Sequence, residues 1–210
     1  MRGLYAIVDT ASLLALEISP LEFARRVLEA RPAALQLRAK QLRARETLAL
    51  LAELRPLASK AGTPLFANDR PDLGLLAGRD GVHVGQDDLP VAMVRRFAPD
   101  LMVGVSTHDL EQLEAALADD PDYVAFGPLF ATRSKTNPDP VVGLDGLSRA
   151  RALCTSRPLV AIGGIDLERA PEVARRADCG AVISALLPPE GDLDAVAEQA
   201  RRLHLALGGT

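Results

Sequence analysis

The chain has 210 residues, of which 48% are hydrophobic and 25% are charged, and its formal net charge is -4. This length and composition predict an ordinary globular protein that forms one domain over residues 1–210. The acidic balance, together with an aromatic content of only 3%, argues against nucleic acid as the main partner.

Short apolar runs with the length of buried strands recur along the whole chain. The first run is too short for a signal sequence, and no run is long enough to span a bilayer, so we expect a cytoplasmic protein without membrane contact. The predicted strands are, in chain order, Leu4–Asp9, Ala34–Arg38, Leu65–Asn68, Gly81–Gly85, Leu101–Ser106, Tyr123–Gly127, Leu159–Gly163 and Gly180–Ser184.

Helical patterns lie between these runs. Ser19 followed by Pro20 is a typical helix start, with a capping hydroxyl and proline at the first position. Pro56 falls inside another pattern and predicts a kink or an early end there. The predicted helices are Pro20–Glu29, Arg43–Lys60, Asp72–Leu76, Pro90–Phe97, Leu110–Ala118, Leu144–Leu153, Arg169–Ala177 and Leu193–Leu207.

This alternation predicts an α/β fold, a single-domain (β/α)8 TIM barrel. Right-handed crossovers through helices give parallel strands, and eight such units fit the chain length. The alternative is an open doubly wound sheet. It lacks support because the first strand is followed by Asp9-Thr10-Ala11-Ser12 and not by a glycine-rich turn. In a barrel, functional residues gather at the carboxyl ends of the strands.

The segment Ala33–Lys40 carries the first candidate residues. Strand alternation places Gln36, Arg38 and Lys40 on one face, and no carboxylate stands among the adjacent residues. On an outer surface this would be a solvated face. Inside a barrel, however, such cations need an anion, because a desolvated and unpaired charge is too costly. The segment therefore predicts an anion site if the barrel fold is correct.

Carboxylates follow the next two strands. Asp69 comes after the third strand, and Asp87 and Asp88 come after the fourth. Two carboxylates, completed by a phosphate oxygen and waters, suit Mg²⁺. In the alternative, Asp69 pairs with Arg70, and the aspartates after the fourth strand cap the helix that begins near Pro90. The neighbouring cations favour the metal site.

The fifth strand ends with Ser106 and His108 on one face. Ser106 is suited to donate a hydrogen bond to an anion. His108 is either a proton carrier or simply the first residue of the next helix, and the sequence leaves both interpretations open. His83 and His204 are expected to be structural.

The loop after the sixth strand, residues 127–138, is long, polar and cationic, which is typical of an active-site lid or of a variable surface loop. Lysine is rare among the 24 basic residues and occurs only as Lys40, Lys60 and Lys135. Lys60 ends a helix. Lys40 and Lys135 follow strands, where a compact and movable ammonium is useful.

The seventh strand ends in Gly163-Gly164 and the eighth in Ile183-Ser184. Glycine allows close approach to the backbone, and amides at a following helix start bind phosphate, although the glycines alone would also suit a tight turn. This second anion site is neutral, whereas the first is cationic. A diphosphate with Mg²⁺ fits the first and a monophosphate the second, which predicts group transfer between two small phosphorylated substrates.

Seven motifs in this order make the chain resemble the thiamine-phosphate synthase family, also called thiamine-phosphate pyrophosphorylase. The resemblance spans nearly the whole chain and implies a transferase. Hydroxymethylpyrimidine diphosphate loses pyrophosphate, and the ring nitrogen of hydroxyethylthiazole phosphate captures the resulting cation to give thiamine phosphate. The motifs are 36–40, 68–70, 81–88, 104–108, 127–135, 161–165 and 182–184.

The resemblance also implies roles for individual residues. It places the pyrimidine diphosphate at Gln36, Arg38, Lys40, Asn68, Ser106 and Lys135, of which Arg38, Lys40, Ser106 and Lys135 would act in catalysis. It places Mg²⁺ at Asp69 and Asp88, and the thiazole phosphate at Thr132, Arg133, Ser134, Gly164, Ile183 and Ser184. The segment Ala131–Lys135 departs slightly from the family pattern Pro-Thr-x-Thr-Lys, but Ser134 keeps the hydroxyl.

Three other functions fit parts of the pattern. A thiazole tautomerase on the same fold would share the phosphate site and use His108, without needing the diphosphate cradle or two carboxylates. A Schiff-base aldolase would use Lys135 or Lys40. A barrel that binds ligands without catalysis would show affinity but no turnover. A homo-oligomer is possible in each case.

Overall fold

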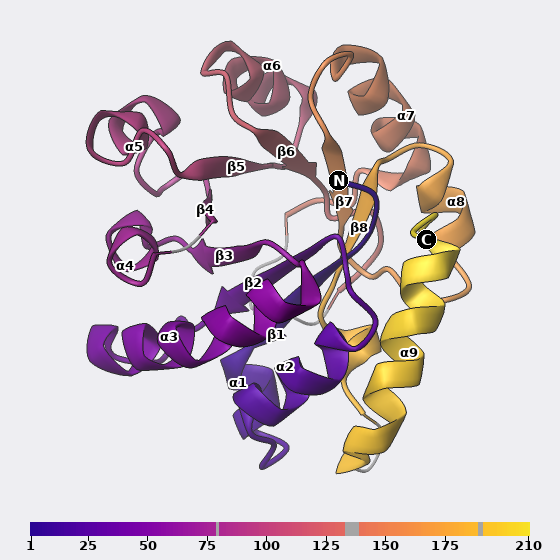
Figure 1. Ribbon diagram of the computed structural model, residues 1–210. Helices are drawn as coiled ribbons and strands as arrows, with labels where there is room; N and C mark the ends of the chain where they lie inside the picture. The colour runs from indigo at the N-terminus through magenta and orange to yellow at the C-terminus, as the bar shows by residue number, and fades with distance from the viewer. Residues whose placement is uncertain (79, 133–138, 189–190) are drawn as a thin grey trace.

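The computed structural model describes residues 1–78, 80–132, 139–188 and 191–210. Within these ranges, parallel strands β1 to β8 pair in chain order, and β8 pairs with β1 to close a barrel (Figure 1). The strands are β1 Gly3–Asp9, β2 Ala34–Arg38, β3 Leu65–Asn68, β4 Gly81–Val84, β5 Met102–Thr107, β6 Tyr123–Phe126, β7 Leu159–Ile162 and β8 Cys179–Val182. The predicted (β/α)8 barrel is thus confirmed.

Helices surround the ring of strands, as Figure 1 shows. They are α1 Thr10–Leu14, α2 Pro20–Leu28, α3 Ala44–Ala61, α4 Pro71–Leu76, α5 Val91–Phe97, α6 Leu110–Ala118, α7 Gly143–Leu153, α8 Ala170–Ala174 and α9 Leu193–Ala206, with a 3₁₀ turn, η1, at Ser184–Leu186. The sequence predicted neither α1 nor η1, and it placed the end of the eighth strand within η1.

Two of the helices illustrate the local rules. The Ser19 hydroxyl accepts a hydrogen bond from the Glu22 amide, so α2 begins as predicted. Helix α3 passes through Pro56 and continues to Ala61, where Gly62 ends it in a left-handed conformation with φ +70°. Proline removes one hydrogen bond from this long helix, and burial of residues such as Leu54 on its inner face outweighs that loss.

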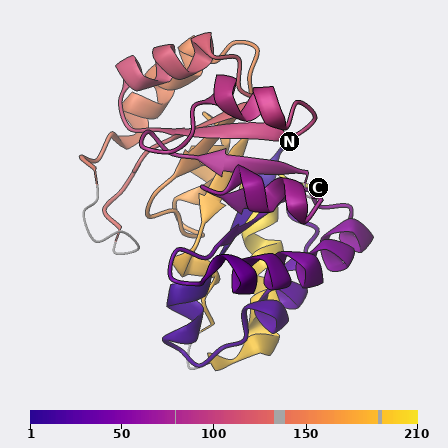
Figure 2. The ribbon, with the colours of Figure 1, turned by 90° about the vertical axis from the view of Figure 1, so that its left-hand side faces the viewer.

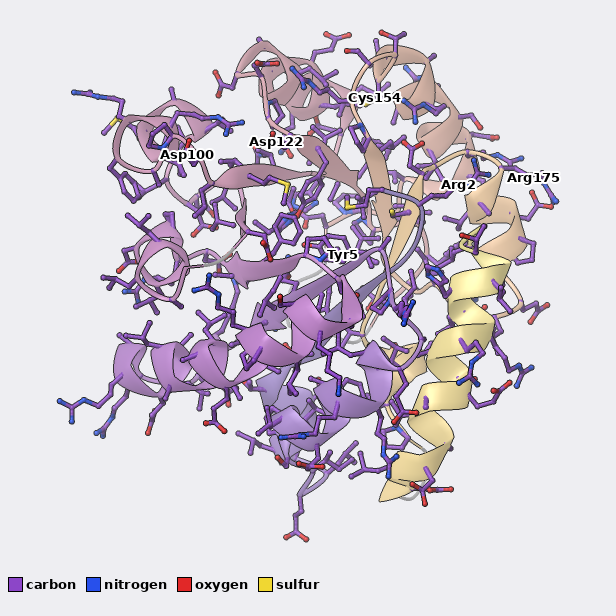
Figure 3. The ribbon with its side chains drawn as sticks, in the orientation of Figure 1. Arg2, Tyr5, Asp100, Asp122, Cys154 and Arg175 are labelled. Atoms are coloured by element: carbon purple, nitrogen blue, oxygen red, sulfur yellow. The ribbon has the colours of Figure 1, made fainter. Side chains whose placement is uncertain are left out.

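The strands are buried on both faces, which explains their nearly continuous apolar sequences. In β1, Leu4 and Val8 pack in the larger apolar cluster between the barrel wall and the helices. Tyr5 and Ile7 alternate with them and belong to the smaller cluster that fills the barrel interior. Figure 3 labels Tyr5 near the middle of the ring of strands.

The two ends of the chain lie side by side, at the amino ends of the strands (Figure 2). The Arg2 side chain donates to the Gly208 carbonyl at 3.2 Å, and Leu4 N donates to His204 Nδ1 at the same distance. His204 therefore has the structural role expected of it. None of the helices in the described ranges combines the length and apolar character needed to cross a bilayer.

Candidate active site

The end of β2 meets a carboxylate that the sequence analysis did not foresee. Asp9, the last residue of β1, pairs in register with Arg38, and the Arg38 guanidinium donates to its Oδ2. The other carboxylate oxygen accepts from the Ser12 amide at 2.9 Å and from the Ser12 hydroxyl at 2.7 Å. Asp9 is only 4% exposed. No carboxylate stands beside these cations in the sequence, and strand pairing brings Asp9 to Arg38 from 29 residues away.

Lys40 is also paired. Its ammonium lies 3.0 Å from Asp69 Oδ2, just beyond the carboxyl ends of β2 and β3. Asp69 adopts a left-handed conformation with φ +61°, and its amide donates to the His83 carbonyl. The alternative pairing of Asp69 with Arg70 is wrong, because Arg70 donates to both carboxylate oxygens of Asp72.

Asp88 lies beside the Lys40–Asp69 pair. Its Oδ2 accepts from the Gly85 amide at 2.7 Å, which closes the turn after β4. Burial raises the pKa of Asp88 above its ordinary value of 3.8, and the nearby charge of Asp69 raises it further. The Asp88 side chain does not cap α5, which begins after Pro90 without a side-chain cap.

This carboxylate pair fits Mg²⁺ in one specific way. Among the described residues, no group of three or more histidine, cysteine, aspartate or glutamate side chains could hold a metal ion. Asp69 and Asp88 nevertheless lie close enough for one to perturb the other. Mg²⁺ is usually bound through one or two carboxylates and completed by substrate phosphates. The pair therefore fits a cation that arrives with a phosphorylated ligand better than a resident one.

A cavity of about 260 Å³ opens at the ends of β2 and β3. Its polar lining includes Lys40, Asn68 and Asp69, and its apolar lining includes Leu37 and Leu73. Asn68 thus lines the same cavity as the Lys40–Asp69 pair.

A chain of hydrogen bonds crosses the barrel interior. Gln36 Nε2 donates to the Tyr5 hydroxyl at 2.9 Å, and the Tyr5 and Tyr123 hydroxyls lie 2.8 Å apart. His83 Nδ1 lies 2.8 Å from the Tyr123 hydroxyl, and His83 Nε2 lies 2.8 Å from Ser106 Oγ. The expectation that His83 is merely structural is incomplete, because its ring contacts a predicted substrate-binding residue.

His108 lies at the end of β5. Its Nδ1 is 2.8 Å from the Gly127 carbonyl oxygen and 3.5 Å from Asp139 Oδ2. The cap of α6 is Asp109, which accepts from the Gln112 amide at 2.8 Å. His108 is thus not the first residue of α6, which begins at Leu110, and its contacts join the end of β5 to Gly127 and Asp139.

The loop after β6 docks on the end of β7. Phe130 N donates to the Gly163 carbonyl at 3.1 Å. Arg169 donates to the Gly164 carbonyl at 2.7 Å, and its guanidinium lies 4.6 Å from the centre of the Phe130 ring. Gly164 has φ +63°, and a Cβ there would come within 2.7 Å of the Ala131 carbonyl oxygen.

The other predicted phosphate ligands lie in two places. Thr132 is half-buried at the end of the described part of this loop, while Arg133, Ser134 and Lys135 lie outside the described residues. Ile183 precedes η1 and Ser184 begins it, next to the β7 side of the barrel. The strand order therefore places Gly164, Ile183 and Ser184 at adjacent strand ends.

Sequence reasoning missed Asp9, Tyr5 and Tyr123. Asp9 ends a strand, so the rule that functional residues lie at strand ends would have found it. Tyr5 and Tyr123 are the only tyrosines of the chain and lie on nonadjacent strands. Their contact depends on barrel closure, and no local pattern indicates it.

A closed (β/α)8 barrel with paired cations and carboxylates at the carboxyl ends of its strands has the architecture of barrel enzymes, whose active sites lie at this end. The family model for thiamine monophosphate synthase matches residues 4–186. The chain belongs to this family.

Individual relatives agree with this assignment. The chain is 48% identical over 192 residues to a thiamine-phosphate synthase of Koribacter versatilis, with 88% of each chain covered. It is 45% identical over 169 residues to one of Chloroflexus aurantiacus, covering 80% of this chain and 77% of the relative. The solved structure of a thiamine phosphate pyrophosphorylase from Pyrococcus furiosus superposes with a TM-score of 0.84 at 32% identity, covering 99% of this chain and 98% of that one.

Proposed function

We propose that this protein joins hydroxymethylpyrimidine diphosphate to hydroxyethylthiazole phosphate, giving thiamine phosphate and pyrophosphate. The observation that supports this function best is the cluster of Lys40, Asp69 and Asp88 at adjacent strand ends. It combines a cation for a leaving diphosphate with two carboxylates for Mg²⁺. Family membership supports the same reaction.

The chemical demand of this reaction is charge stabilisation. When the bond to the diphosphate breaks, negative charge grows on the leaving oxygen, and preorganised cations lower the barrier. Asp9 holds one edge of the Arg38 guanidinium, which leaves other N–H donors for a phosphate. Arg38, Lys40, Ser106 and Lys135 are the proposed catalytic residues, and Gln36 and Asn68 complete the binding site for the pyrimidine diphosphate.

Asp69 and Asp88 would hold Mg²⁺. A bound Mg²⁺ would supply further positive charge to the diphosphate. Lys40 has three N–H donors and a side chain that is 53% exposed, so it is free to turn from Asp69 toward a phosphate oxygen. We infer that the ion pair keeps Lys40 at the rim of the site until the diphosphate arrives.

The second substrate would bind on the other side of the barrel mouth. Gly164, Ile183 and Ser184 would bind its phosphate mainly through backbone amides, and Thr132, Arg133 and Ser134 would approach from the loop after β6. Docking of this loop on β7 would help to exclude water, which matters because water would otherwise capture the pyrimidine cation.

The alternatives fit these contacts less well. A thiazole tautomerase has no use for the Asp69–Asp88 pair. In a Schiff-base aldolase, Lys40 would attack a carbonyl as a neutral amine, whereas here its ammonium is held by a carboxylate.

One assay tests the proposal. The purified protein is incubated with both phosphorylated substrates, with and without Mg²⁺, and thiamine phosphate and pyrophosphate are measured. We expect both products in equal amounts, and only with Mg²⁺. Absence of both products under all conditions would overturn the synthase function, while isomerisation of a thiazole phosphate alone, or borohydride trapping with a carbonyl substrate, would favour an alternative.

A further inference from the structure

The hydrogen bonds inside the barrel form one unbroken chain between two proposed substrate-binding residues. We call Gln36, Tyr5, Tyr123, His83 and Ser106 the interior relay. Its links measure 2.9, 2.8, 2.8 and 2.8 Å in that order. Its members come from β2, β1, β6, β4 and β5, so the relay connects opposite parts of the wall. Four of them are buried, and Ser106 is half-buried at the site.

Proton counting makes the relay directional. Burial raises the pKa of Tyr5 and Tyr123 far above the ordinary tyrosine value, so each hydroxyl keeps its single proton. Tyr5 and Tyr123 are buried, and a buried hydroxyl proton without an acceptor is costly, so each hydroxyl donates to one neighbour and accepts from the other. The direction of the Gln36 link therefore sets the direction of the others, as long as His83 is neutral.

The amide of Gln36 selects the direction. Its Nε2 faces Tyr5 and donates, so the Tyr5 proton points to Tyr123 and the Tyr123 proton points to His83 Nδ1. A neutral imidazole that accepts at Nδ1 carries its proton on Nε2. That proton is donated to Ser106 Oγ, which leaves the Ser106 proton free to point out of the relay.

We propose that the interior relay holds His83 as the neutral Nε2–H tautomer, and thereby presents a carbonyl acceptor at Gln36 and a hydroxyl donor at Ser106 to the heterocyclic substrate. Such a site selects a ring that donates a hydrogen bond to Gln36 on β2 and accepts one from Ser106 on β5. An amino-substituted pyrimidine has both groups. Its oxo analogue, with a carbonyl in place of the amino group and a proton on the adjacent ring nitrogen, has them reversed. This inference rests on the proposed function for the identity of the ring.

The barrel is shaped to hold the relay in place. A Cβ at Gly104 would lie 1.9 Å from Tyr123 Cζ, so only glycine leaves room for this ring between β5 and β6. The Phe66 ring meets Tyr123 edge-on, with centroids 5.5 Å apart, and the His83 ring stacks on it at 5.6 Å. Phe66 thus packs against the relay through apolar contacts and offers a matched control.

The tautomer is tested directly by ¹⁵N NMR of the wild-type protein labelled at histidine, with the His83 signals identified by their loss in His83→Gln. We expect His83 to be neutral, with Nε2 protonated and Nδ1 unprotonated. In Tyr123→Phe the acceptor role of Nδ1 is no longer enforced, so the signals should move toward a mixture of tautomers, whereas Phe66→Leu should preserve them. An Nδ1–H tautomer or an imidazolium in the wild type would overturn the proposal.

Substrate selection is the second readout. Wild-type kcat/KM should favour the amino-pyrimidine diphosphate over its oxo analogue by at least about a hundredfold. Tyr123→Phe, or Tyr5→Phe if the first variant does not fold, should reduce this ratio by about tenfold, the value of one buried hydrogen bond. Phe66→Leu should leave the ratio unchanged. An unchanged ratio in the folded tyrosine variants would refute the relay.

The two proposals fail in different ways. If the wild type makes no thiamine phosphate, the proposed function fails, while the His83 tautomer is still decided by NMR. If the wild type turns over normally and His83 shows the opposite tautomer, the synthase function stands and the relay is wrong.

Discussion

The ammonium of Lys40 lies 3.0 Å from Asp69 Oδ2, so Lys40 forms an ion pair with one of the two carboxylates proposed to hold Mg²⁺. The contact bridges the ends of β2 and β3, and Asp88 lies beside it. Lysine and metal would compete for the same oxygen, and a diphosphate would resolve this competition by giving each a new partner. Binding of Mg²⁺ and of the diphosphate should therefore reinforce each other.

Removing either charge of this site should slow the chemical step. We expect Asp69→Ala and Arg38→Ala to lower kcat by two or more decades, since each loses about 3 kcal/mol of transition-state stabilisation. Steady-state kinetics at saturating substrates measures this. Arg25→Ala is the control, because Arg25 lies on α2 and pairs with Glu22 of the same helix. Normal turnover in both test variants would exclude the metal–diphosphate site.

Asp9 should act by positioning Arg38. Asp9→Asn weakens the acceptor of the guanidinium, and we expect kcat/KM for the pyrimidine diphosphate to fall at least tenfold, while KM for the thiazole phosphate changes little. Ser12→Ala removes the Ser12 hydroxyl contact to the other carboxylate oxygen and should cost about 1 kcal/mol of stability without this kinetic effect. Equal kinetic effects in the two variants would point to a general loss of structure.

The stability of the metal-free protein should depend on the ionisation of Asp88. Its pKa is raised in the folded state, chiefly by burial and further by Asp69. A carboxyl with a raised folded pKa contributes stability below its unfolded pKa and loses that contribution as the pH rises through the folded value. We therefore expect Asp88→Asn to gain thermal stability relative to the wild type as the pH is raised from about 4 to about 7.

Melting temperatures of the wild type and of Asp88→Asn are compared at each pH, so that the contributions of the other carboxylates to stability cancel. With the pyrimidine diphosphate present, added Mg²⁺ should stabilise the wild type and reduce the difference, because the cation needs ionised carboxylates. A difference between the two proteins that does not change with pH would contradict the role assigned to Asp88.

Gly164 should be required for the docking of the loop after β6. Gly164→Ala adds a methyl group within 2.7 Å of the Ala131 carbonyl oxygen, at a φ of +63°. We expect KM for the thiazole phosphate to rise at least tenfold, because the backbone that would bind its phosphate must shift. Gly143→Ala is the matched control, with φ +66° and nothing within 4 Å of the added methyl group.

Both alanine variants place a residue with a side chain in the left-handed conformation, which costs about 1 kcal/mol. Thermal unfolding should therefore show a similar loss of stability from this strain in both variants. Only Gly164→Ala should affect the kinetics of the thiazole phosphate. If Gly143→Ala raises this KM equally, backbone strain alone explains the effect and the docking contact does not matter.

The sequence by itself determined the (β/α)8 barrel and nearly all of its elements. Strand and helix patterns are local, so the runs at Ala34–Arg38 and Leu65–Asn68 were predicted with the bounds that the structure has. The placement of candidate residues at strand ends followed from the same pattern. Short elements such as α1 escaped prediction, because this helix depends on one capping contact to Asp9.

Only the tertiary structure decided which side chains meet. Arg38 faces Asp9 because β1 and β2 pair in that register, and Tyr5 reaches Tyr123 because the sheet closes on itself. Neither contact leaves a local trace, since the partners are separated by 29 and 118 residues. The sequence of each strand specifies which side chains share a face. The partner of such a side chain, Asp9 for Arg38 or Tyr123 for Tyr5, is set by strand register and barrel closure.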